Sequence, residues 1–237
     1  MGVYSRHREK AMRYLLSGVC ILLSLSVAGS PPVLSAQGDS TLYVVSYIEA
    51  AAASQGRVAM MLRQLADASR KEGPMRYEAL QRATDSNQFL LLEIWKDQRA
   101  LDAHAGAAHT RQFREQVAPL LLAPIDERLC VATMVVPLRE GRGTVYVVTH
   151  IDVPGTSRDA AMRLMQPFID QSRNDPGNMR VDVVHQKDRT NHFTAIEAWA
   201  DQKSGDDHQL APHTRTFRRE ITPLLGALYD QRWYRPL

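Results

Sequence analysis

The sequence contains the same segment twice, and this repeat limits what the chain can fold into. Residues 87–129 and 191–233 align without a gap at an offset of 104, with 20 identities in 43 positions. The pairs that carry most of the side-chain chemistry are Phe89/Phe193, Glu93/Glu197, Trp95/Trp199, His104/His208, His109/His213 and Arg111/Arg215. Similarity of this extent indicates an internal duplication. Each unit runs for about 95 residues, which is the size of a small domain and too long for a solenoid repeat.

The two copies extend upstream, because residues 41–49 match residues 144–152 at an offset of 103. The change of offset places a one-residue insertion near Asn178. We therefore predict a first domain over residues 40–136, a linker over residues 137–143 and a second domain over residues 144–237. The linker is short and contains glycine and charged residues, which suits two tightly docked halves.

Residues 1–36 have the pattern of a signal peptide. Four basic residues precede the apolar run Leu15–Ala28, and a stretch with prolines and small residues follows it up to Ala36. The run holds 14 residues, fewer than the roughly 18 that indicate a transmembrane helix. We predict cleavage after Ala36, with Ala28 as the second candidate site, and hence a secreted or periplasmic protein without a stable membrane anchor. An uncleaved anchor is the alternative.

The charge balance beyond the predicted signal peptide argues against anionic partners. Residues 37–237 contain 25 Lys and Arg against 25 Asp and Glu, so the formal charge of +3 belongs to the leader. A neutral chain without a basic run offers no electrostatic basis for binding nucleic acid or an anionic membrane. Cys130 is the single cysteine in this part, so an intramolecular disulfide is excluded and the fold depends on burial.

Within each unit the hydrophobic pattern predicts the order strand, helix, strand, strand, broken helix, strand. For the first unit we expect strands over 43–49, 75–83, 88–95 and 125–136, a helix from Ser54, and helical segments near 98–104 and 108–121. This order is the ferredoxin-like βαββαβ unit of the α+β class. Helices cover one face of such a sheet, and the bare apolar face needs a partner. We expect two such domains packed sheet to sheet as an internal pseudo-dimer, a dimeric α/β barrel in one monomeric chain, with further self-association left open.

One face of the strand over 88–95 carries an acid between aromatic residues. Alternation places Phe89, Glu93 and Trp95 on this face, and the copy places Phe193, Glu197 and Trp199 in the same way. Burial of an acid here predicts a raised pKa unless the carboxylate is paired. The alternative is a structural Glu bonded to a backbone amide or to an arginine, for which Arg111 and Arg215 are the candidates.

The two histidines of each unit lie five residues apart. On one continuous helix their side chains would diverge by about 140°. Gly106 indicates a break between His104 and His109, and Pro212 indicates one between His208 and His213 in the copy. His109 and His213 would then begin a new helix, whose positive end favours a neutral imidazole that can accept a proton. The alternative is that the histidines cap helix ends and bond to loop carbonyls. No third ligand of suitable spacing is evident, so we expect no metal site.

The motif Phe-x-x-x-Glu-x-Trp-x-Asp-Gln, followed by His-x-x-x-x-His-Thr-Arg-x-Phe, occurs in both units. It resembles the antibiotic biosynthesis monooxygenase family, including its quinol monooxygenase-like members. The resemblance covers nearly all of the chain beyond the predicted signal peptide and implies the barrel fold. For activity it implies a cofactor-independent monooxygenase that acts on a phenolic or hydroquinone-type molecule. Relatives also include haem-degrading enzymes and isomerases, so the fold does not determine the reaction.

Oxygenation without a cofactor requires a base, an apolar cavity with aromatic walls and space for dioxygen. The candidate catalytic residues are His109, His213, His104, His208, Glu93 and Glu197, with the histidines as bases and the acids as orienting groups. The candidate substrate-binding residues are Trp95, Trp199, Phe89 and Phe193. The expected partners are a small hydrophobic aromatic substrate and dioxygen. The lack of a glycine-rich nucleotide motif agrees with the expectation of no cofactor.

Two other functions stay open. Haem-degrading relatives use an asparagine on the first strand and a histidine in the second helix, and both positions differ here. The strand carries Ser46 and Tyr47 or Thr149 and His150, and the helix carries Arg114 or Arg218, which counts against haem. The third hypothesis is a non-catalytic periplasmic protein that binds a hydrophobic small molecule. Either copy, or both, could be active, because both keep the motif.

Overall fold

The computed structural model describes residues 41–138 and 141–237, so the predicted signal peptide and two residues of the predicted linker lie outside the described part. The strands are β1 (Leu42–Glu49), β2 (Arg76–Arg82), β3 (Gln88–Trp95), β4 (Asp126–Met134), β5 (Val145–Asp152), β6 (Asn178–Gln186), β7 (Arg189–Trp199) and β8 (Asp230–Pro236). The α-helices are α1 (Gln55–Ser69), α2 (Gln98–Ala105), α3 (Ala108–Val117), α4 (Arg158–Ser172), α5 (Gln202–Leu210) and α6 (Pro212–Ile221). Among the described helices, none has the length and apolar character needed to cross a bilayer.

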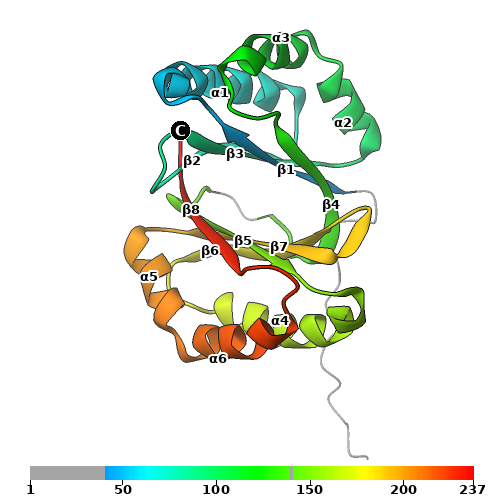
Figure 1. Cartoon of the computed structure of the whole chain (residues 1–237), viewed down its shortest axis with the longest axis vertical. Helices are drawn as coiled ribbons and strands as arrows, with labels where there is room; N and C mark the ends of the chain where they lie inside the picture. The colour runs from blue at the N-terminus through cyan, green and yellow to red at the C-terminus, as the bar shows by residue number, and fades with distance from the viewer. Residues whose placement is uncertain (1–40, 139–140) are drawn as a thin grey trace, which may run out of the picture. The chain divides into compact units, whose positions relative to one another are not determined.

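Short 3-10 turns flank the helices, and the turn η2 (Arg70–Glu72) directly follows α1. The elements from β1 to β4 and from β5 to β8 follow the same order (Figure 1). This order matches the predicted βαββαβ unit, and the second helical region of each unit is broken, as predicted. In α1 the apolar side chains recur at intervals of three and four residues, at Val58, Met61, Leu62 and Leu65, all of which are buried.

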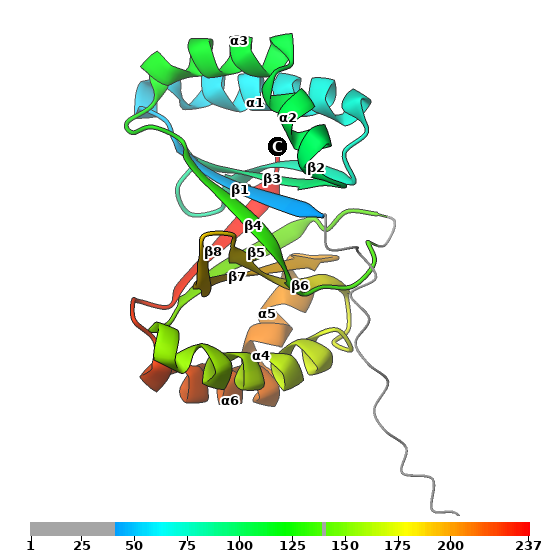
Figure 2. The ribbon, with the colours of Figure 1, turned by 90° about the vertical axis from the view of Figure 1, so that its right-hand side faces the viewer.

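The strands form one closed antiparallel barrel. Its order is β1-β3-β2-β8-β5-β7-β6-β4, which contains the ferredoxin-like order twice. Edge strands join the two units, since β2 pairs with β8 and β4 pairs with β6, as Figure 2 shows for β4 and β6. Closure leaves no unpaired edge in the sheet formed by the described strands. The expected dimeric α/β barrel within a single chain is confirmed.

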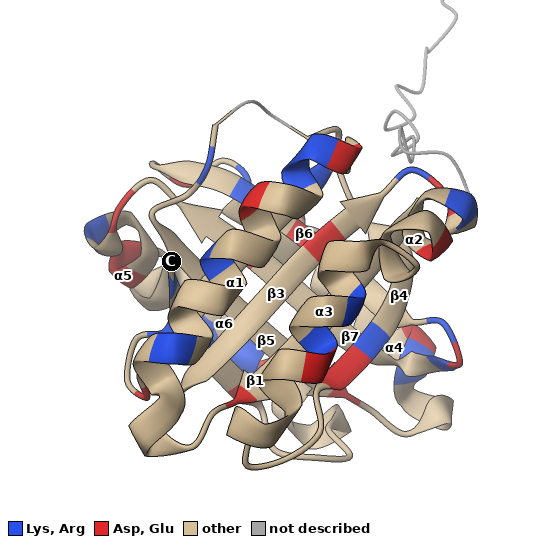
Figure 3. Ribbon diagram, turned by 90° about the horizontal axis from the view of Figure 1, so that it is seen from above, with Lys and Arg blue, Asp and Glu red and all other residues tan. Residues whose placement is uncertain are grey.

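Alternation along the strands separates the barrel interior from the layers under the helices. Leu90, Leu92 and Ile94 belong to the interior core, whereas Phe89 and Trp95 of the same strand belong to the core under the helices. Figure 3 shows α1 and α3 lying over β3, with acidic and basic residues mixed on the helices. Cys130 is fully buried in the interior core, and this burial raises the pKa of its thiol to about 12.

The insertion predicted near Asn178 is absorbed by an irregularity in the pairing of β6 with β7. The register shifts between Asn178 and Arg180, so two residues of β6 oppose one of β7. The turn before β6 contains Gly177 with φ of 75°, a left-handed conformation that favours glycine. A Cβ atom at this position would overlap the side chain of Ser204, so the second copy depends on glycine here for two reasons.

The two halves differ by a compensating exchange in the layer between helix and sheet. Gly205 on α5 faces the indole of Trp233 on β8, and a Cβ atom at Gly205 would lie 3.0 Å from that ring. At the corresponding positions the first half has Leu101 and Leu129, both packed against its core. A large residue on the strand is therefore balanced by the smallest residue on the helix.

Candidate functional site

In each half, an acid and a tryptophan lie on the strand face that the helices cover. The indole Nε1 of Trp95 donates to Oε2 of Glu93 at 2.8 Å, and both side chains are buried. In the second half Trp199 donates to Glu197 at 3.1 Å. Burial raises the pKa of Glu93 and of Glu197 to about 7, against the opposing effect of the indole bond.

The predicted rise in the pKa of these acids is therefore confirmed, but the predicted partners are wrong. Among the residues that the structure describes, neither a backbone amide nor Arg111 or Arg215 donates to these carboxylates, whose hydrogen bonds come from the indoles. Arg111 donates instead to the carbonyl of Gly106. The indole can serve as the partner because residues two apart on a strand point to the same face, which brings Trp95 beside Glu93.

Local sequence brings the two histidines of the first half together. The side chain of Asp97 accepts from the amide of Ala100 at 2.7 Å and so caps the start of α2. This helix ends at Ala105, and α3 starts at Ala108. His104 therefore lies in the last turn of one helix and His109 in the first turn of the next, as the break predicted.

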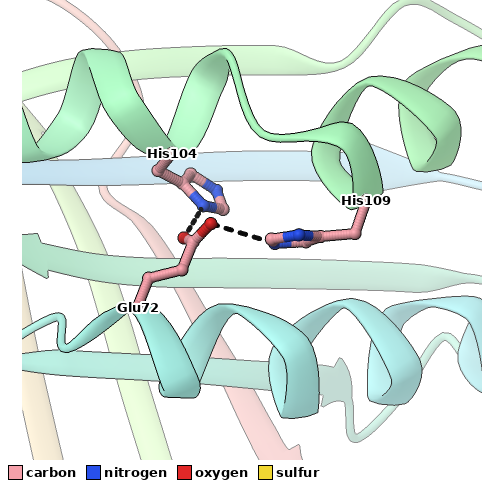
Figure 4. A group of neighbouring side chains, drawn as sticks. All are labelled: Glu72, His104 and His109. Atoms are coloured by element: carbon pink, nitrogen blue, oxygen red, sulfur yellow. Dashed lines mark hydrogen bonds and ion pairs between the residues drawn. The ribbon is translucent and has the colours of Figure 1, made fainter.

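Both imidazole rings face the carboxylate of Glu72, which lies at the end of η2 (Figure 4). Nδ1 of His104 lies 2.6 Å from Oε2 of Glu72, and Nε2 of His109 lies 3.4 Å from Oε1. The hypothesis that the histidines cap helix ends is wrong, because the residue that caps α3 is Ala107, without a side-chain bond. Their partner is a carboxylate and not a loop carbonyl.

His104 is enclosed between the two acids. Its ring stacks on Trp95 at 4.8 Å between centroids, and its Nε2 lies 3.7 Å from Oε2 of Glu93. Tyr77 packs edge-on against the same ring at 5.6 Å. Burial lowers the pKa of His104, against the opposing effect of Glu72, so the imidazole is neutral near pH 7. With Nδ1–H directed to Glu72, its Nε2 lone pair faces Glu93.

The second half repeats this arrangement with Asp175 in place of Glu72. Nδ1 of His208 and Nε2 of His213 lie 2.7 and 3.1 Å from Oδ2 of Asp175. His208 stacks on Trp199 at 4.6 Å, and its Nε2 lies 3.5 Å from Glu197. Burial lowers the pKa of His208 as it does that of His104. We call the groups Glu72/His104/His109 and Asp175/His208/His213 the first and second His-carboxylate clusters.

Sequence reasoning missed the two carboxylates. Glu72 and Asp175 precede their histidines by more than thirty residues and lie outside the repeated motif. The sequence did contain a sign of their role. The two acids are related by the same offset of 103 as the upstream strands, and each directly precedes a glycine and a proline that end a helix. Their proximity to the histidines follows from the packing of α1 against α3 and of α4 against α6.

Two clefts open beside the first cluster. One of about 330 Å³ is bordered by Glu72, Trp95 and His104, together with Asp97 and Arg99. A smaller one of about 150 Å³ is bordered by Leu65, Phe113 and His109. The cluster thus lies between two openings to solvent. Phe89 and Phe193, predicted to contact substrate, are instead fully buried in the cores under the helices.

The second cluster is more enclosed than the first. The residue of the second half that corresponds to Leu65 is Phe168. Its ring centroid lies 5.7 Å from that of His208 and 6.3 Å from that of His213. Phe168 also stacks on Phe217 at 4.2 Å. As a result, the side chain of His213 is 11% exposed, compared with 32% for His109.

The residues at the positions that haem-degrading relatives use make other interactions in this protein. Arg114 pairs with Glu127, and Arg218 donates to Gln231 at 2.8 Å. His150 lies 3.0 Å from Nη1 of Arg128, and the alternation along β5 directs it to the barrel interior. Neither half therefore presents a histidine from the second helical region at the position that haem-degrading relatives use.

Comparisons with known proteins agree with this fold. The family model described as antibiotic biosynthesis monooxygenase matches residues 41–116 and 144–220. The YcnE protein of Bacillus subtilis (strain 168), provisionally named a monooxygenase, is 36% identical over 56 residues, which are 24% of this chain and 59% of that protein.

Two crystal structures share the fold across both repeats. One, of a provisionally named monooxygenase from Fusobacterium nucleatum, has a TM-score of 0.74 at 14% identity and covers 84% of this chain and 93% of that chain. Another, from Lactobacillus acidophilus, has a TM-score of 0.66 at 14% identity, with 83% and 94% covered. Since the family model matches both halves and more than half of the chain, the protein belongs to the antibiotic biosynthesis monooxygenase family, as a tandem duplication.

Proposed function

We propose that the protein is a monooxygenase that oxidises a small phenolic or hydroquinone-type molecule without a bound cofactor, at the clefts beside the first His-carboxylate cluster. The observation that carries this proposal is the neutral His104 held between Glu72 and Glu93 at the wall of an accessible cleft. Membership of the family supports the reaction class. The mixed polar and aromatic lining, which includes Trp95, suits a small aromatic molecule with hydroxyl groups.

The proposed reaction begins with removal of a phenolic proton. Glu72 and His109 are the most exposed groups of the cluster, with side chains 24% and 32% exposed, so they accept this proton. His104 is a positioning residue, because it is buried between Trp95 and Glu72 and orients the carboxylate. General-base catalysis of this type typically contributes 10²–10⁴ in rate.

The electrons come from the substrate itself. The deprotonated hydroquinone is electron-rich and reduces dioxygen. One oxygen atom replaces a ring hydrogen as a hydroxyl group, and the other leaves as water. The ring is oxidised from the hydroquinone to the quinone level in the same turnover. The four electrons that reduce dioxygen are thus accounted for without a flavin or a metal.

We assign turnover to the first half. Phe168 occupies the space beside His208 and His213 that Leu65 leaves open in the first half, so the second cluster is less accessible to a substrate. The second half keeps its acid and histidines but supplies mainly the barrel partner.

The test is oxygen uptake by EDTA-treated protein with a panel of hydroquinones. We expect His109→Ala to lower kcat at least tenfold, whereas His213→Ala retains the wild-type rate within about twofold. Leu65→Phe should lower activity by filling the first cleft, and Phe168→Leu is the matched control in the other half. Equal rates for wild type and His109→Ala, or no oxygen uptake with any hydroquinone, would refute the proposal.

We also propose that the protein is exported, on the basis of the signal-peptide pattern in residues 1–36. Mass spectrometry of the protein purified from its native cell envelope tests this idea. A mature N-terminus at Gln37, or at Gly29 for the second candidate site, is expected, and an intact leader on a cytoplasmic protein would contradict it.

A further inference from the structure

The first His-carboxylate cluster brings three potential metal ligands to one point. A ligand atom from each of Glu72, His104 and His109 lies within 4.8 Å of the other two. Figure 4 shows the three side chains directed toward one another. The ligands come from three separate elements, η2, α2 and α3. In the second cluster Asp175, His208 and His213 satisfy the same distance limit.

Two imidazole nitrogens and one carboxylate oxygen form a common donor set for zinc and similar divalent transition metals. With bonds of about 2.0–2.2 Å, neighbouring ligand atoms in a tetrahedral shell lie about 3.3 Å apart. The nitrogen-to-oxygen distances in the two clusters are 2.6 and 3.4 Å in the first and 2.7 and 3.1 Å in the second. Shifts below 1 Å would therefore bring each of these nitrogen–oxygen pairs to the spacing of neighbouring ligands around one ion.

The surroundings of the clusters resemble the outer shell of a metal site. A metal-bound histidine usually has its second nitrogen near a carboxylate that orients the ring. Nε2 of His104 lies 3.7 Å from Glu93, whose position is fixed by the indole of Trp95. Stacking on Trp95 also restricts the ring plane, so His104 is held in place before any ion binds.

The buried Nε2 atoms of His109 and His213 support the same conclusion. Each lies near a carboxylate but does not make a hydrogen bond of acceptable geometry. A ring nitrogen that faces a carboxylate at 3.1–3.4 Å without bonding to it has the spacing expected around a small ion.

The duplication provides an internal comparison. The lining of the clusters has changed between the halves, with Leu65 replaced by Phe168 and Tyr77 by Val181. The donor set has been kept, including a carboxylate whose length differs between Glu72 and Asp175. Two different packing environments thus produce the same arrangement of nitrogen and oxygen atoms.

From these observations we infer that each His-carboxylate cluster is a binding site for a divalent transition-metal ion of the zinc type, with three protein ligands. In the first half a fourth position is open to the clefts beside the cluster, and in the second half Phe168 restricts it. An ion here coordinates Glu72 and His109, the groups that accept the proton in the proposed reaction, so it inhibits turnover. The inhibition rests on the proposed function, whereas the binding does not.

The binding is tested without substrate, by calorimetric titration of EDTA-stripped full-length protein with zinc chloride. We expect two zinc ions per chain in the wild type, one in His109→Ala or His213→Ala, and none in the double variant. His192→Ala is the matched control, because His192 is a partly exposed histidine that pairs with Asp152 outside the clusters, and it should retain two sites. Cobalt titration should give the visible absorption bands of a tetrahedral ion, lost in the double variant.

Glu72→Gln and Asp175→Asn provide a second pair of variants with nearly unchanged side-chain shape, in case removal of an imidazole prevents folding. Each should weaken zinc binding at its own cluster at least tenfold. No saturable zinc binding by the wild type, or binding that the double variants retain, would overturn the inference. Such a result would leave oxygen uptake by the metal-free protein unaffected, so the two proposals fail independently.

Discussion

The buried acids Glu93 and Glu197 make the stability of this protein depend on pH in a predictable direction. In the folded chain the pKa of each is about 7, compared with an ordinary value of 4.5. Between these values the folded state holds protons that the unfolded state has released. The free energy of unfolding should therefore fall as the pH rises through this window and become constant above it.

The magnitude follows from the two pKa values. A shift of one unit corresponds to about 1.4 kcal/mol. Integrated from pH 5.5 to pH 8.5, the shift of each glutamate corresponds to a loss of about 2 kcal/mol, and the two together to about 4 kcal/mol. Both carboxyl groups are almost fully buried, so solvent screening does not reduce this value appreciably.

Replacement of both residues by glutamine isolates the effect. Glutamine still accepts from the indole through its carbonyl oxygen but does not titrate. From pH 5.5 to pH 8.5, the free energy of unfolding of the Glu93→Gln/Glu197→Gln variant should rise by about 4 kcal/mol relative to that of wild type. The histidines that titrate in the same range are present in both proteins, so their contribution to the difference cancels to first order.

The assay is urea unfolding with EDTA present at four pH values from 5.5 to 8.5, followed by far-UV circular dichroism. Glu115→Gln, at an exposed position on α3, is the control. Its free energy of unfolding should differ from that of wild type by the same amount at all four pH values. A constant difference between wild type and the double glutamine variant across this range would refute the reasoning, since the acids would then titrate alike in the folded and unfolded states.

Three further predictions concern packing. Gly177→Ala should lower the free energy of unfolding by at least 1–2 kcal/mol, because φ is positive and the new Cβ meets Ser204; thermal unfolding measures this. Gly205→Ala should raise the free energy of unfolding of the Trp233→Leu variant by about 1 kcal/mol, which is the gain in helix propensity. It should not stabilise the wild type, because the new Cβ atom meets the indole of Trp233. A double-mutant cycle in which the two effects are additive would contradict this prediction. Cys130 should react with an aromatic disulfide reagent at pH 8 only after unfolding, because burial raises its pKa to about 12; rapid reaction of the native protein would be inconsistent with this.

The repeat made the fold predictable. Two copies with the same strand and helix order predicted two ferredoxin-like units, and a sheet with one apolar face predicted their association. Alternation along the strand over 88–95 correctly separated Leu90 and Leu92 from Glu93 and Trp95. These features depend on local periodicity, which a single sequence contains.

The contacts within the site were less predictable, because they depend on packing between distant segments. Glu72 reaches His104 only because α1 and the broken helix lie side by side, and no local pattern encodes that distance. The prediction that Arg111 and Arg215 pair with the buried acids was wrong for a related reason. Arg111 lies on an exposed surface, whereas Trp95 lies on the same strand as Glu93, two residues away.

Covalent duplication allows the two halves to differ in ways that identical subunits cannot. The contribution of the second cluster to stability explains why its residues are kept although Phe168 restricts access to it. Removal of one member of a buried polar network leaves its partner unsatisfied at a cost of about 1–3 kcal/mol. His208 is almost completely buried between Asp175 and Glu197, so its loss is costly whether or not this half turns over substrate. We therefore expect His208→Ala to lower the free energy of unfolding of the metal-free protein by about 1–3 kcal/mol with kcat within about twofold of wild type. A large loss of kcat in a fully folded His208→Ala protein would contradict this division of roles and place turnover in the second half.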